Sequence, residues 1–320
     1  MILFIVYYVK FGPVYPEYNR SRMLVINSLR QEGKDNGTNY MCNSGVCSQV
    51  IDMLKDLPHM DKISASCNIG TLYGNAITLP ESGEEYQPMT HLVNADFWNV
   101  FDFQFLSGKP FSEADVASNL PKAIITESLA QRIFAQTDVA GRSILIDGNE
   151  HEVCGVVKDA STATSVTMGE VYLPLYWGGL LSPEAHDTGL TGNIQLYLLS
   201  KDDDVEALRT EVQEVVKQHS LQDKYDNKMF GQPDTWWENY FRTSCAGEPD
   251  IASAIRGILY MLLAFLFIPA LNLCGMVSSR MDAIISSNIS PDCRRNSVTG
   301  FLCAYACRRI LPFSSSIASR

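Results

Sequence analysis

The longest apolar stretch of the chain lies near its C-terminal end. Residues 257–278 (GILYMLLAFLFIPALNLCGMVS) contain no charged side chain. An α-helix rises about 1.5 Å per residue, so this run is long enough to cross about 30 Å of hydrocarbon. A core helix of a large soluble protein can also be apolar on all sides, but few such helices run this far without a charge. We therefore predict one transmembrane helix with its span at residues 257–278, inside a membrane region of residues 245–283.

A second apolar run opens the sequence at residues 1–8 (MILFIVYY). It is shorter than the roughly 20 residues that a membrane span needs, and it lacks the basic start and the cleavage site of a signal peptide. It fits a buried strand or the last part of a first transmembrane helix. Because a membrane span follows later, we interpret residues 1–17 as a remnant of that first helix.

Between these runs, strands alternate with amphipathic helices. Residues 22–27 are typical of a strand, and apolar positions at helical spacing follow at residues 46–57. Residues 194–199 are again typical of a strand, and a helix with one apolar stripe follows at residues 205–216, after three aspartates that suit a helix N-terminus. Two strand-helix units this far apart indicate one α/β subdomain that an insertion interrupts.

The insertion is richer in strands. Asp147-Gly148 stands between two β-branched runs and predicts a β-hairpin. Thr126 is placed to cap a short helix over residues 127–134. The predicted strands of the insertion are residues 122–126, 143–146, 151–157 and 170–176.

Charge is distributed unevenly along the chain. The formal net charge is −11 overall; residues 251–320 carry +5, which leaves −16 for residues 1–250. An acidic body argues against nucleic-acid binding, which requires clustered Lys and Arg. Arginines but no lysines follow the apolar span, so the positive-inside rule predicts a cytoplasmic C-terminus and an extracytoplasmic body.

Aromatic side chains gather shortly before the span. Trp236, Trp237, Tyr240 and Phe241 lie at helical spacings, a composition that suits the headgroup layer of a membrane. Packing in the protein core is the alternative interpretation.

No catalytic or ligand-binding motif stands out. The sequence contains no Gly-x-x-x-x-Gly-Lys-Ser/Thr phosphate loop, no Gly-x-Ser-x-Gly and no His-Glu-x-x-His. The five histidines share no spacing, and no second Cys or His pair stands at zinc spacing. We therefore predict that the chain is not an enzyme and has no catalytic, cofactor-binding or metal site. Of the nine cysteines, Cys42 and Cys47 could close a small disulfide loop in an oxidising compartment.

Three segments in the middle of the chain resemble the MacB-like periplasmic core domain of bacterial ABC transporter permeases of the MacB/FtsX type. They are residues 94–111, where an aromatic helix precedes a Ser-Gly-Lys-Pro-Phe turn, residues 123–142, and the strand at residues 151–159 (HEVCGVVKD). Their order and spacing, followed by the membrane helix, make the combination specific. The residues that carry the resemblance are Asn94, Phe97, Phe101, Gly108, Phe111, Glu127, Phe134, Gly141, Gly155 and Asp159, with Pro269 and Asn272 in the membrane helix.

The resemblance implies an α+β fold. A porter-like α/β subdomain with an inserted β-rich subdomain, at about residues 88–190, would form a periplasmic core domain over residues 18–244, followed by one transmembrane helix. It also implies a location in the bacterial cytoplasmic (inner) membrane with the core domain in the periplasm. The implied partners are a cytoplasmic ABC ATPase subunit, a second permease copy in a dimer, a periplasmic adaptor and membrane lipid, but no nucleic acid.

The chain departs from the family pattern at both ends. A full first helix is expected before residue 18, and a cytoplasmic coupling segment with two further helices is expected after Ala283. Residues 284–320 instead show no clear periodicity and hold Cys293, Cys303 and Cys307. We interpret them as an atypical cytoplasmic tail that reads like translation out of frame.

Two functions follow from the resemblance. The first is a permease subunit whose periplasmic domain transmits ATPase-driven motion for export or extrusion of a substrate. The alternative is an FtsX-like membrane regulator or sensor of peptides or cell-wall hydrolases that moves no substrate. Fold does not fix function, so the substrate stays open.

Overall fold

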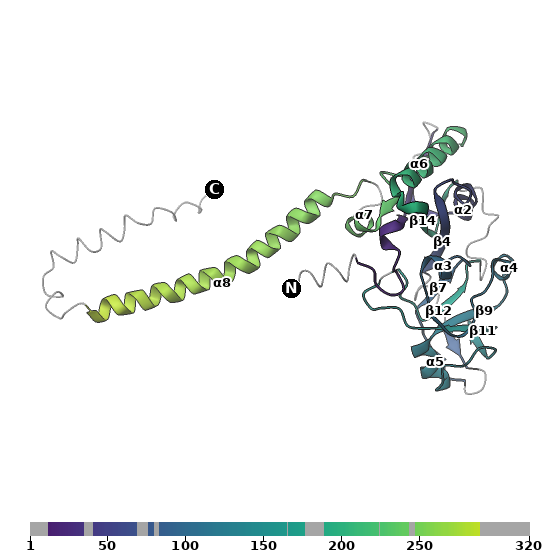
Figure 1. The fold of residues 1–320 in the computed structure, drawn as a ribbon, viewed down its shortest axis with the longest axis horizontal. Coiled ribbons are helices and arrows are strands. Elements are labelled where there is room, and N and C mark those ends of the chain that lie inside the picture. The colour runs from purple at the N-terminus through teal and green to yellow at the C-terminus, as the bar shows by residue number, and fades with distance from the viewer. Residues whose placement is uncertain are drawn as a thin grey trace. The chain divides into compact units, whose positions relative to one another are not determined.

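The structure is a computed structural model of the chain. It describes residues 12–34, 41–68, 76–79, 83–164, 166–176, 189–223, 225–242 and 247–288. These residues fall into two compact units that divide after Ile251. The first unit is the core domain with its sheets, and the second consists of the C-terminal helix α8 (Ile251–Asn288) (Figure 1).

One mixed sheet of twelve strands forms the centre of the described core domain. The strand order is β16-β1-β14-β4-β7-β12-β9-β11-β10-β5-β6, and β8 also pairs with β11. The strands are β1 (Met23–Ile26), β4 (Met60–Asn68), β5 (Ile77–Thr78), β6 (Glu85–Tyr86), β7 (Thr90–Val93), β8 (Phe105–Gly108), β9 (Lys122–Thr126), β10 (Ser143–Ile146), β11 (Asn149–Val157), β12 (Val171–Pro174), β14 (Gln195–Ser200) and β16 (Asp234–Thr235).

The sheet joins distant parts of the chain. Strand β1 pairs antiparallel with β14, so that Met23 lies opposite Leu199, and β14 pairs in turn with β4. The strands of residues 88–190 enter the same sheet through the pairing of β4 with β7. Strands β5 and β6 lie at that end of the sheet although they precede residue 88. The division of the core domain into two subdomains stays a prediction.

A second, smaller sheet has the order β13-β3-β2-β15. Its strands are β2 (Leu29–Gly33), β3 (Met41–Val46), β13 (Thr191–Gly192) and β15 (Tyr225–Lys228). Cys47 follows β3 as a free thiol, and its Sγ lies 3.5 Å from the carbonyl oxygen of Gly189. The side chain of Cys42, its expected disulfide partner, lies outside the described residues.

Among the described residues, six α-helices, α2 to α7, belong to the unit that holds the sheets, and α8 belongs to the second unit (Figure 1). α2 packs against β4 and against α6, whereas α5 packs against β9 and β11. All four residues of β1 are buried, which requires cover on both faces of the sheet. The α-helices are α2 (Ser48–Leu54), α3 (Phe97–Val100), α4 (Glu113–Ala117), α5 (Glu127–Phe134), α6 (Val205–Gln222), α7 (Trp236–Phe241) and α8.

The fold confirms the α+β class and most predicted elements. The predicted hairpin is β10–β11, and both turn residues have the positive φ of a type I′ turn, 48° at Asp147 and 77° at Gly148. Thr126 caps α5 by accepting from the backbone N–H of Leu129. Short aromatic-rich α7 follows the expected helical spacing, but Phe241 is buried, because its ring packs edge-to-face on Trp237 and Tyr240. Both of these rings belong to α7 itself, and Phe241 is not among the side chains of the described hydrophobic core cluster.

Helix α8 spans 38 residues, and its first 34 form a candidate membrane span with a mean hydropathy of 2.2 in the most apolar window. It is longer at both ends than the predicted span. The residues on both sides of the predicted span are more polar, but they continue the same helix. Residues 1–11 of the predicted remnant at residues 1–17, and the tail beyond Asn288, lie outside the described residues.

Candidate functional site: the two connections of the core domain

A buried ion pair anchors the segment that leads into β1. We call residues 12–22 the N-terminal connection. The side chains of Glu17 and Arg20 are 0% and 3% exposed, and Nη2 of Arg20 lies 2.6 Å from Oε2 of Glu17. Arg20 also donates from Nη1 to the carbonyl oxygen of Gly12, at 2.9 Å. A short segment with little apolar surface is thus fixed by charge-assisted hydrogen bonds.

Glu17 also ties this connection to a distant loop. Its Oε1 accepts from the backbone N–H of Thr167, at 3.2 Å, and from the Thr167 hydroxyl, at 2.9 Å. Burial raises the pKa of Glu17, while Arg20 and Thr167 act in the opposite direction. Through these buried hydrogen bonds, the Glu17 carboxylate joins the N-terminal connection to Thr167, which lies 150 positions away in sequence.

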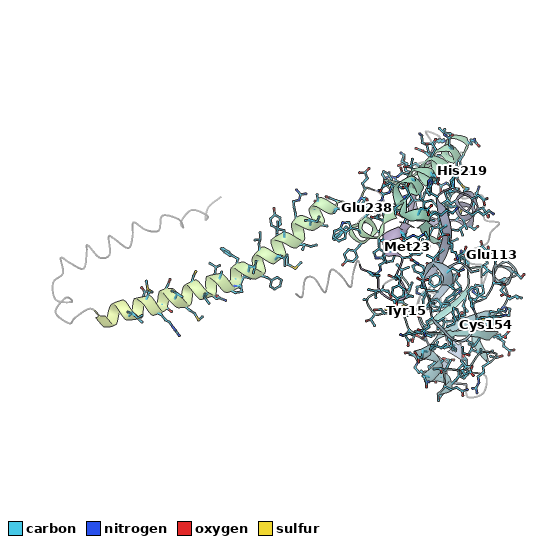
Figure 2. All side chains as sticks on the ribbon, in the orientation of Figure 1. Tyr15, Met23, Glu113, Cys154, His219 and Glu238 are labelled. Atoms are coloured by element: carbon cyan, nitrogen blue, oxygen red, sulfur yellow. The ribbon has the colours of Figure 1, made fainter. Side chains whose placement is uncertain are left out.

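Tyr15 supplies a third attachment (labelled in Figure 2). Its hydroxyl accepts from the backbone N–H of Gln104, at 3.0 Å, and donates to the carbonyl oxygen of Lys158, at 3.3 Å. Its ring packs edge-to-face against Phe103, with centroids 6.2 Å apart. The N-terminal connection is therefore hydrogen-bonded to the residues that precede β8 and follow β11.

A second buried ion pair holds the segment that leaves the core domain. We call residues 234–250 the C-terminal connection. The side chains of Asp234 and Arg242 are 1% and 5% exposed, and Nη2 of Arg242 lies 2.6 Å from Oδ1 of Asp234. Arg242 also donates to the carbonyl oxygens of Phe230 and Gly247. The guanidinium thus joins both ends of α7 to the loop before it.

The N-terminus of α7 is capped reciprocally and tied to α6. The Thr235 hydroxyl accepts from the backbone N–H of Glu238, whose carboxylate accepts from the backbone N–H of Thr235. Arg209 of α6 donates to the same carboxylate (Glu238 is labelled in Figure 2). Burial opposes ionisation, but the bonds from Arg209 and Thr235 hold the pKa of Glu238 below its ordinary value.

The two connections meet. Strand β1, which follows the first, pairs with β16 of the second, with Leu24 opposite Thr235. The Arg20 guanidinium lies 5.0 Å from the centroid of a Trp236 ring, within the range of a cation–π contact. The Asn27 amide donates to the side-chain oxygen of Asn239 in α7. A displacement of either connection therefore acts on the other.

Three of the four phenylalanines in the predicted family set, Phe97, Phe101 and Phe111, lie in one aromatic cluster. Phe97 is fully buried, and its ring centroid lies 4.9 Å from that of Phe101 and 5.5 Å from that of Phe103. Trp98 packs edge-to-face on Phe111, with centroids 5.7 Å apart. Phe101 reaches Tyr197 of β14 at 5.2 Å. The cluster joins α3 to strands on both sides of the β4–β7 pairing.

Asn94 and Asp159 hold backbone groups. The side-chain oxygen of Asn94 accepts from the backbone N–H of Ala65, and its amide donates to the carbonyl oxygen of Ile63, both at 2.9 Å. Asp159 accepts from the backbone N–H and hydroxyl of Ser128 at the N-terminus of α5. Both side chains thus replace missing backbone partners.

Glu127 and Phe134 mark the two ends of α5. Glu127 lies in its acidic first turn, where a carboxylate suits the helix dipole. Phe134 ends the helix, and Arg142 lies 5.2 Å above its ring.

Gly108 and Gly155 lie opposite each other where β8 pairs with β11. A Cβ on Gly108 would lie 2.1 Å from the carbonyl oxygen of Cys154, and φ there is +68°. A Cβ on Gly155 would lie 2.9 Å from the Phe105 ring and 3.0 Å from the carbonyl oxygen of Lys109. Gly141 has φ +87° but open space around it. Close backbone approach thus requires glycine at the first two, and backbone conformation requires it at the third.

Pro269 and Asn272 lie within α8. A proline inside a helix removes one backbone hydrogen bond, and an asparagine in an apolar helix is a donor and acceptor for a neighbouring helix. These two residues belong to the helical unit, whereas the ten others of the predicted set belong to the core domain.

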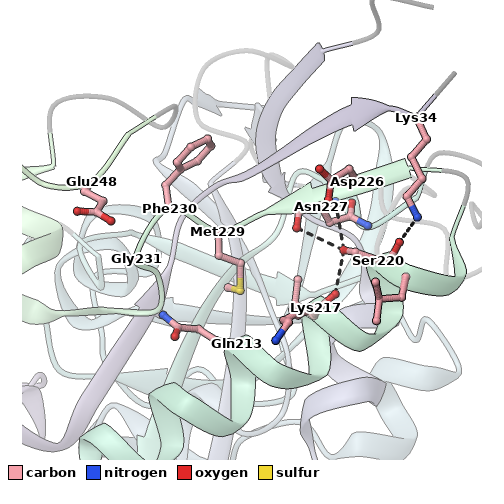
Figure 3. A pocket seen from close by; sticks show the side chains of 12 residues that line it. Lys34, Gln213, Lys217, Ser220, Asp226, Asn227, Met229, Phe230, Gly231 and Glu248 are labelled. Carbon is pink, nitrogen blue, oxygen red and sulfur yellow. Dashed lines mark hydrogen bonds between the residues drawn. The ribbon is translucent and has the colours of Figure 1, made fainter. Parts of the chain in front are cut away.

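A surface pocket of about 480 Å³ lies between α6 and β15 (Figure 3). Lys34 lies at one end and donates to the carbonyl oxygens of Ser220, in the last turn of α6, and of Asp223, the residue that follows α6. The Ser220 hydroxyl accepts from the backbone N–H of Asn227. These bonds hold the C-terminus of α6 against the small sheet. We therefore interpret this pocket as a packing gap between two joined elements.

Within the described residues, no cluster of three or more His, Cys, Asp or Glu side chains is arranged to hold a metal ion. The sequence singled out Phe97, Phe101, Phe111 and the glycines as family-motif residues but missed the ion pairs Glu17–Arg20 and Asp234–Arg242. The available signal was the close spacing of each pair in sequence, three and eight residues. Such spacing is common on exposed surfaces, so it does not reveal burial.

Comparisons with known proteins identify the family of the core domain. Residues 18–215 match the family described as the MacB-like periplasmic core domain. A curated relative, the uncharacterized ABC transporter permease YknZ of Bacillus subtilis (strain 168), is 26% identical over 142 residues, which are 44% of this chain and 35% of the relative. The match thus spans about a third of the length of that relative.

Two solved structures are similar at low identity. The periplasmic region of MacB from Actinobacillus actinomycetemcomitans is 14% identical, with a TM-score of 0.45 over 68% of this chain and 94% of that one. The extracellular domain of YknZ, described as a noncanonic ABC-type transporter from Gram-positive bacteria, is 16% identical, with a TM-score of 0.43 over 64% and 98%. Since the family match covers more than half of the sequence, the chain belongs to the MacB-like periplasmic core domain family of ABC transporter permeases.

Proposed function

We propose that this chain is a permease subunit of a bacterial ABC transporter, and that its periplasmic core domain transmits ATPase-driven motion for export or extrusion of a substrate. The partners are a cytoplasmic ABC ATPase subunit, a second permease copy and a periplasmic adaptor. The location is the cytoplasmic (inner) membrane. The observation that carries the proposal is the meeting of two connections, each anchored by a buried ion pair.

The anchoring matters because a moving part transmits force only if its attachment does not open first. Removing one partner of a buried ion pair costs about 3–5 kcal/mol, whereas an exposed pair contributes about 0–1 kcal/mol. The Glu17–Arg20 and Asp234–Arg242 pairs are both almost fully buried. Local opening at these points is therefore costly, and motion of the membrane segments passes into the sheet.

The twelve residues of the predicted family set support the same function as structural elements. Phe97, Phe101 and Phe111 keep α3 rigid on the sheet, and Gly108 and Gly155 hold β8 close to β11. We assign the remaining residues to helix caps, turns and the packing of the membrane helix. None acts as a catalyst in this proposal.

The test measures ATP hydrolysis by the partner ATPase in proteoliposomes. The chain is compared with a version continued by a family-type cytoplasmic coupling segment after Ala283. We expect only the continued version to bind the ATPase and to raise its turnover, because transmission requires differential contact in two states. Equal stimulation by both versions would show that the atypical tail is functional.

A second comparison tests transmission through the connections. In the continued version, Arg20→Met should leave ATPase binding intact and abolish the substrate-dependent rise in turnover. Lys55→Met, which removes an exposed pair with Asp52, is the matched control and should change nothing. A continued permease that regulates turnover without any response to transported substrates would favour the FtsX-like regulator instead.

A further inference from the structure

A polar cavity lies beside the junction of the two connections. It has a volume of about 200 Å³ and is lined by side chains of β4, β7, β14 and α7, of the loop before β12 and of the residue that follows β1. The lining residues on the strands are Ser66, His91, Gln195 and Tyr197, with Asn27 at the end of β1. Asn239 of α7 and Val166 complete the wall.

The position of the cavity follows from strand register. Gln195 lies opposite Ser66 across the β14–β4 pair, so these polar side chains share one face of the sheet. The aromatic cluster covers the neighbouring part of that face, where Phe101 packs on Tyr197. The same sheet face therefore changes from an apolar core to a polar cavity beneath α7.

The side chains that line the cavity are uncharged. Its described side chains offer three amides, two hydroxyls, one imidazole and one apolar contact, but no carboxylate, ammonium or guanidinium group. A charged ligand would lose its hydration without gaining an opposite charge, whereas hydroxyl and amide groups find both donors and acceptors here.

His91 is the residue that points to a ligand. It is 2% exposed, and its Nε2 lies 3.0 Å from the carbonyl oxygen of Met168, so that nitrogen carries the proton and donates. Burial lowers the pKa of His91 to about 4, which keeps the ring neutral. Its Nδ1 is then an acceptor, and it has no hydrogen-bond partner in the described part of the chain. An unmet buried acceptor is unfavourable by about 1–3 kcal/mol.

We propose that this cavity binds an uncharged polyhydroxy compound the size of one sugar ring. One hydroxyl supplies the donor that Nδ1 of His91 lacks, and others bond the amides of Gln195 and Asn239. Water fills about 30 Å³ per molecule in the liquid, so a 200 Å³ cavity has room for several waters or for one such ring. Because Asn239 belongs to α7 and bonds Asn27, an occupied cavity also fixes α7 on the sheet.

The test uses the full chain in lipid nanodiscs prepared without sugar detergents. Saturation-transfer NMR measures binding of D-glucose, N-acetyl-D-glucosamine and D-glucuronate. We expect signals from the two neutral sugars and at least a tenfold weaker affinity for the glucuronate anion. Absence of binding by both neutral sugars, or equal binding of the anion, would overturn the proposal.

Variants locate the bound sugar. Gln195→Ala should weaken binding about fivefold, as expected for one lost hydrogen bond, and Val166→Phe should abolish it by filling the cavity. Gln218→Ala, on the exposed face of α6, is the matched control. Thermal melting verifies that each variant is folded. Full binding by folded Val166→Phe would place the ligand elsewhere and overturn the assignment. The binding readout needs no ATPase, so its outcome is independent of the proposed function.

Discussion

At the scale of single residues, the aromatic cluster makes one side chain more important than its size suggests. Phe97 is completely buried, and its ring packs against the rings of Phe101, Phe103 and Tyr172. We expect Phe97→Ala to lower the free energy of unfolding by about 3–5 kcal/mol, because it removes buried apolar surface and leaves a cavity. Urea unfolding of residues 12–250 as a soluble fragment measures it.

The control is Leu106→Ala, since Leu106 is 41% exposed and should change the free energy of unfolding by less than about 1 kcal/mol. A cooperatively unfolding fragment that Phe97→Ala does not destabilise would contradict the packing of this cluster.

His91 makes stability depend on pH in a defined window. Burial lowers its pKa from 6.5 to about 4 in the folded state. The unfolded chain therefore takes up the proton first, so the stabilising contribution is present above pH 6.5 and is lost as pH falls towards 4. The free energy of unfolding falls by roughly 3 kcal/mol across this window through the titration of His91. In His91→Gln, the free energy of unfolding should fall less steeply across this window.

His59 provides the matched comparison. The hydrogen bond that its ring donates to the Glu211 carboxylate raises the pKa of His59, so its contribution to stability has the opposite sign: it is present below pH 6.5 and is lost as pH rises. His59→Gln should therefore leave the fall between pH 6.5 and 4 in place. Identical pH profiles for the native chain and His91→Gln would refute the assignment to His91.

At the scale of elements, α7 depends on one arginine. Arg242 joins Asp234, Phe230 and Gly247, and it is 5% exposed. Arg242→Met should destabilise the core domain by about 3–5 kcal/mol, because the Asp234 carboxylate is left buried without its partner. Hydrogen exchange should show early opening of α7.

The double variant Arg242→Met/Asp234→Leu separates pairing from packing. Since both charges are removed, a large part of the stability should return. No recovery in the double variant would mean that packing around α7, and not the ion pair, holds the element in place.

At the scale of the whole molecule, the apolar helix and the charge distribution predict a topology. Residues before about Ala254 should lie outside the cytoplasm, and residues after Arg280 inside it. In a variant without native cysteines, a thiol at exposed Glu150 (Glu150→Cys) should react with a membrane-impermeant maleimide in intact cells from which the outer membrane has been removed.

A thiol at Ala283 (Ala283→Cys) is the control and should react only after the membrane is ruptured. Labelling of Glu150→Cys that also requires rupture would reverse the orientation.

Local patterns alone were sufficient for several features of this protein. The charge-free run at residues 257–278 predicted the apolar helix, and the Asp147-Gly148 turn predicted the β10–β11 hairpin. Both signals work from sequence because length, period and turn conformation are properties of neighbouring residues. The motifs at residues 94–111 and 151–159 likewise pointed to the family, which the match over residues 18–215 confirms.

Tertiary structure alone decided where the charges are buried. Glu17 precedes β1 and Thr167 precedes β12, whereas Arg209 follows β14 and Glu238 follows β16; these pairs form only because the four strands belong to one sheet. It also shows that a core domain begun at residue 18 would lose Glu17 and leave the Arg20 guanidinium buried without its carboxylate. A sequence pattern reports how polar a residue is, whereas burial depends on distant segments packing over it, and that packing is determined only when the whole sheet forms.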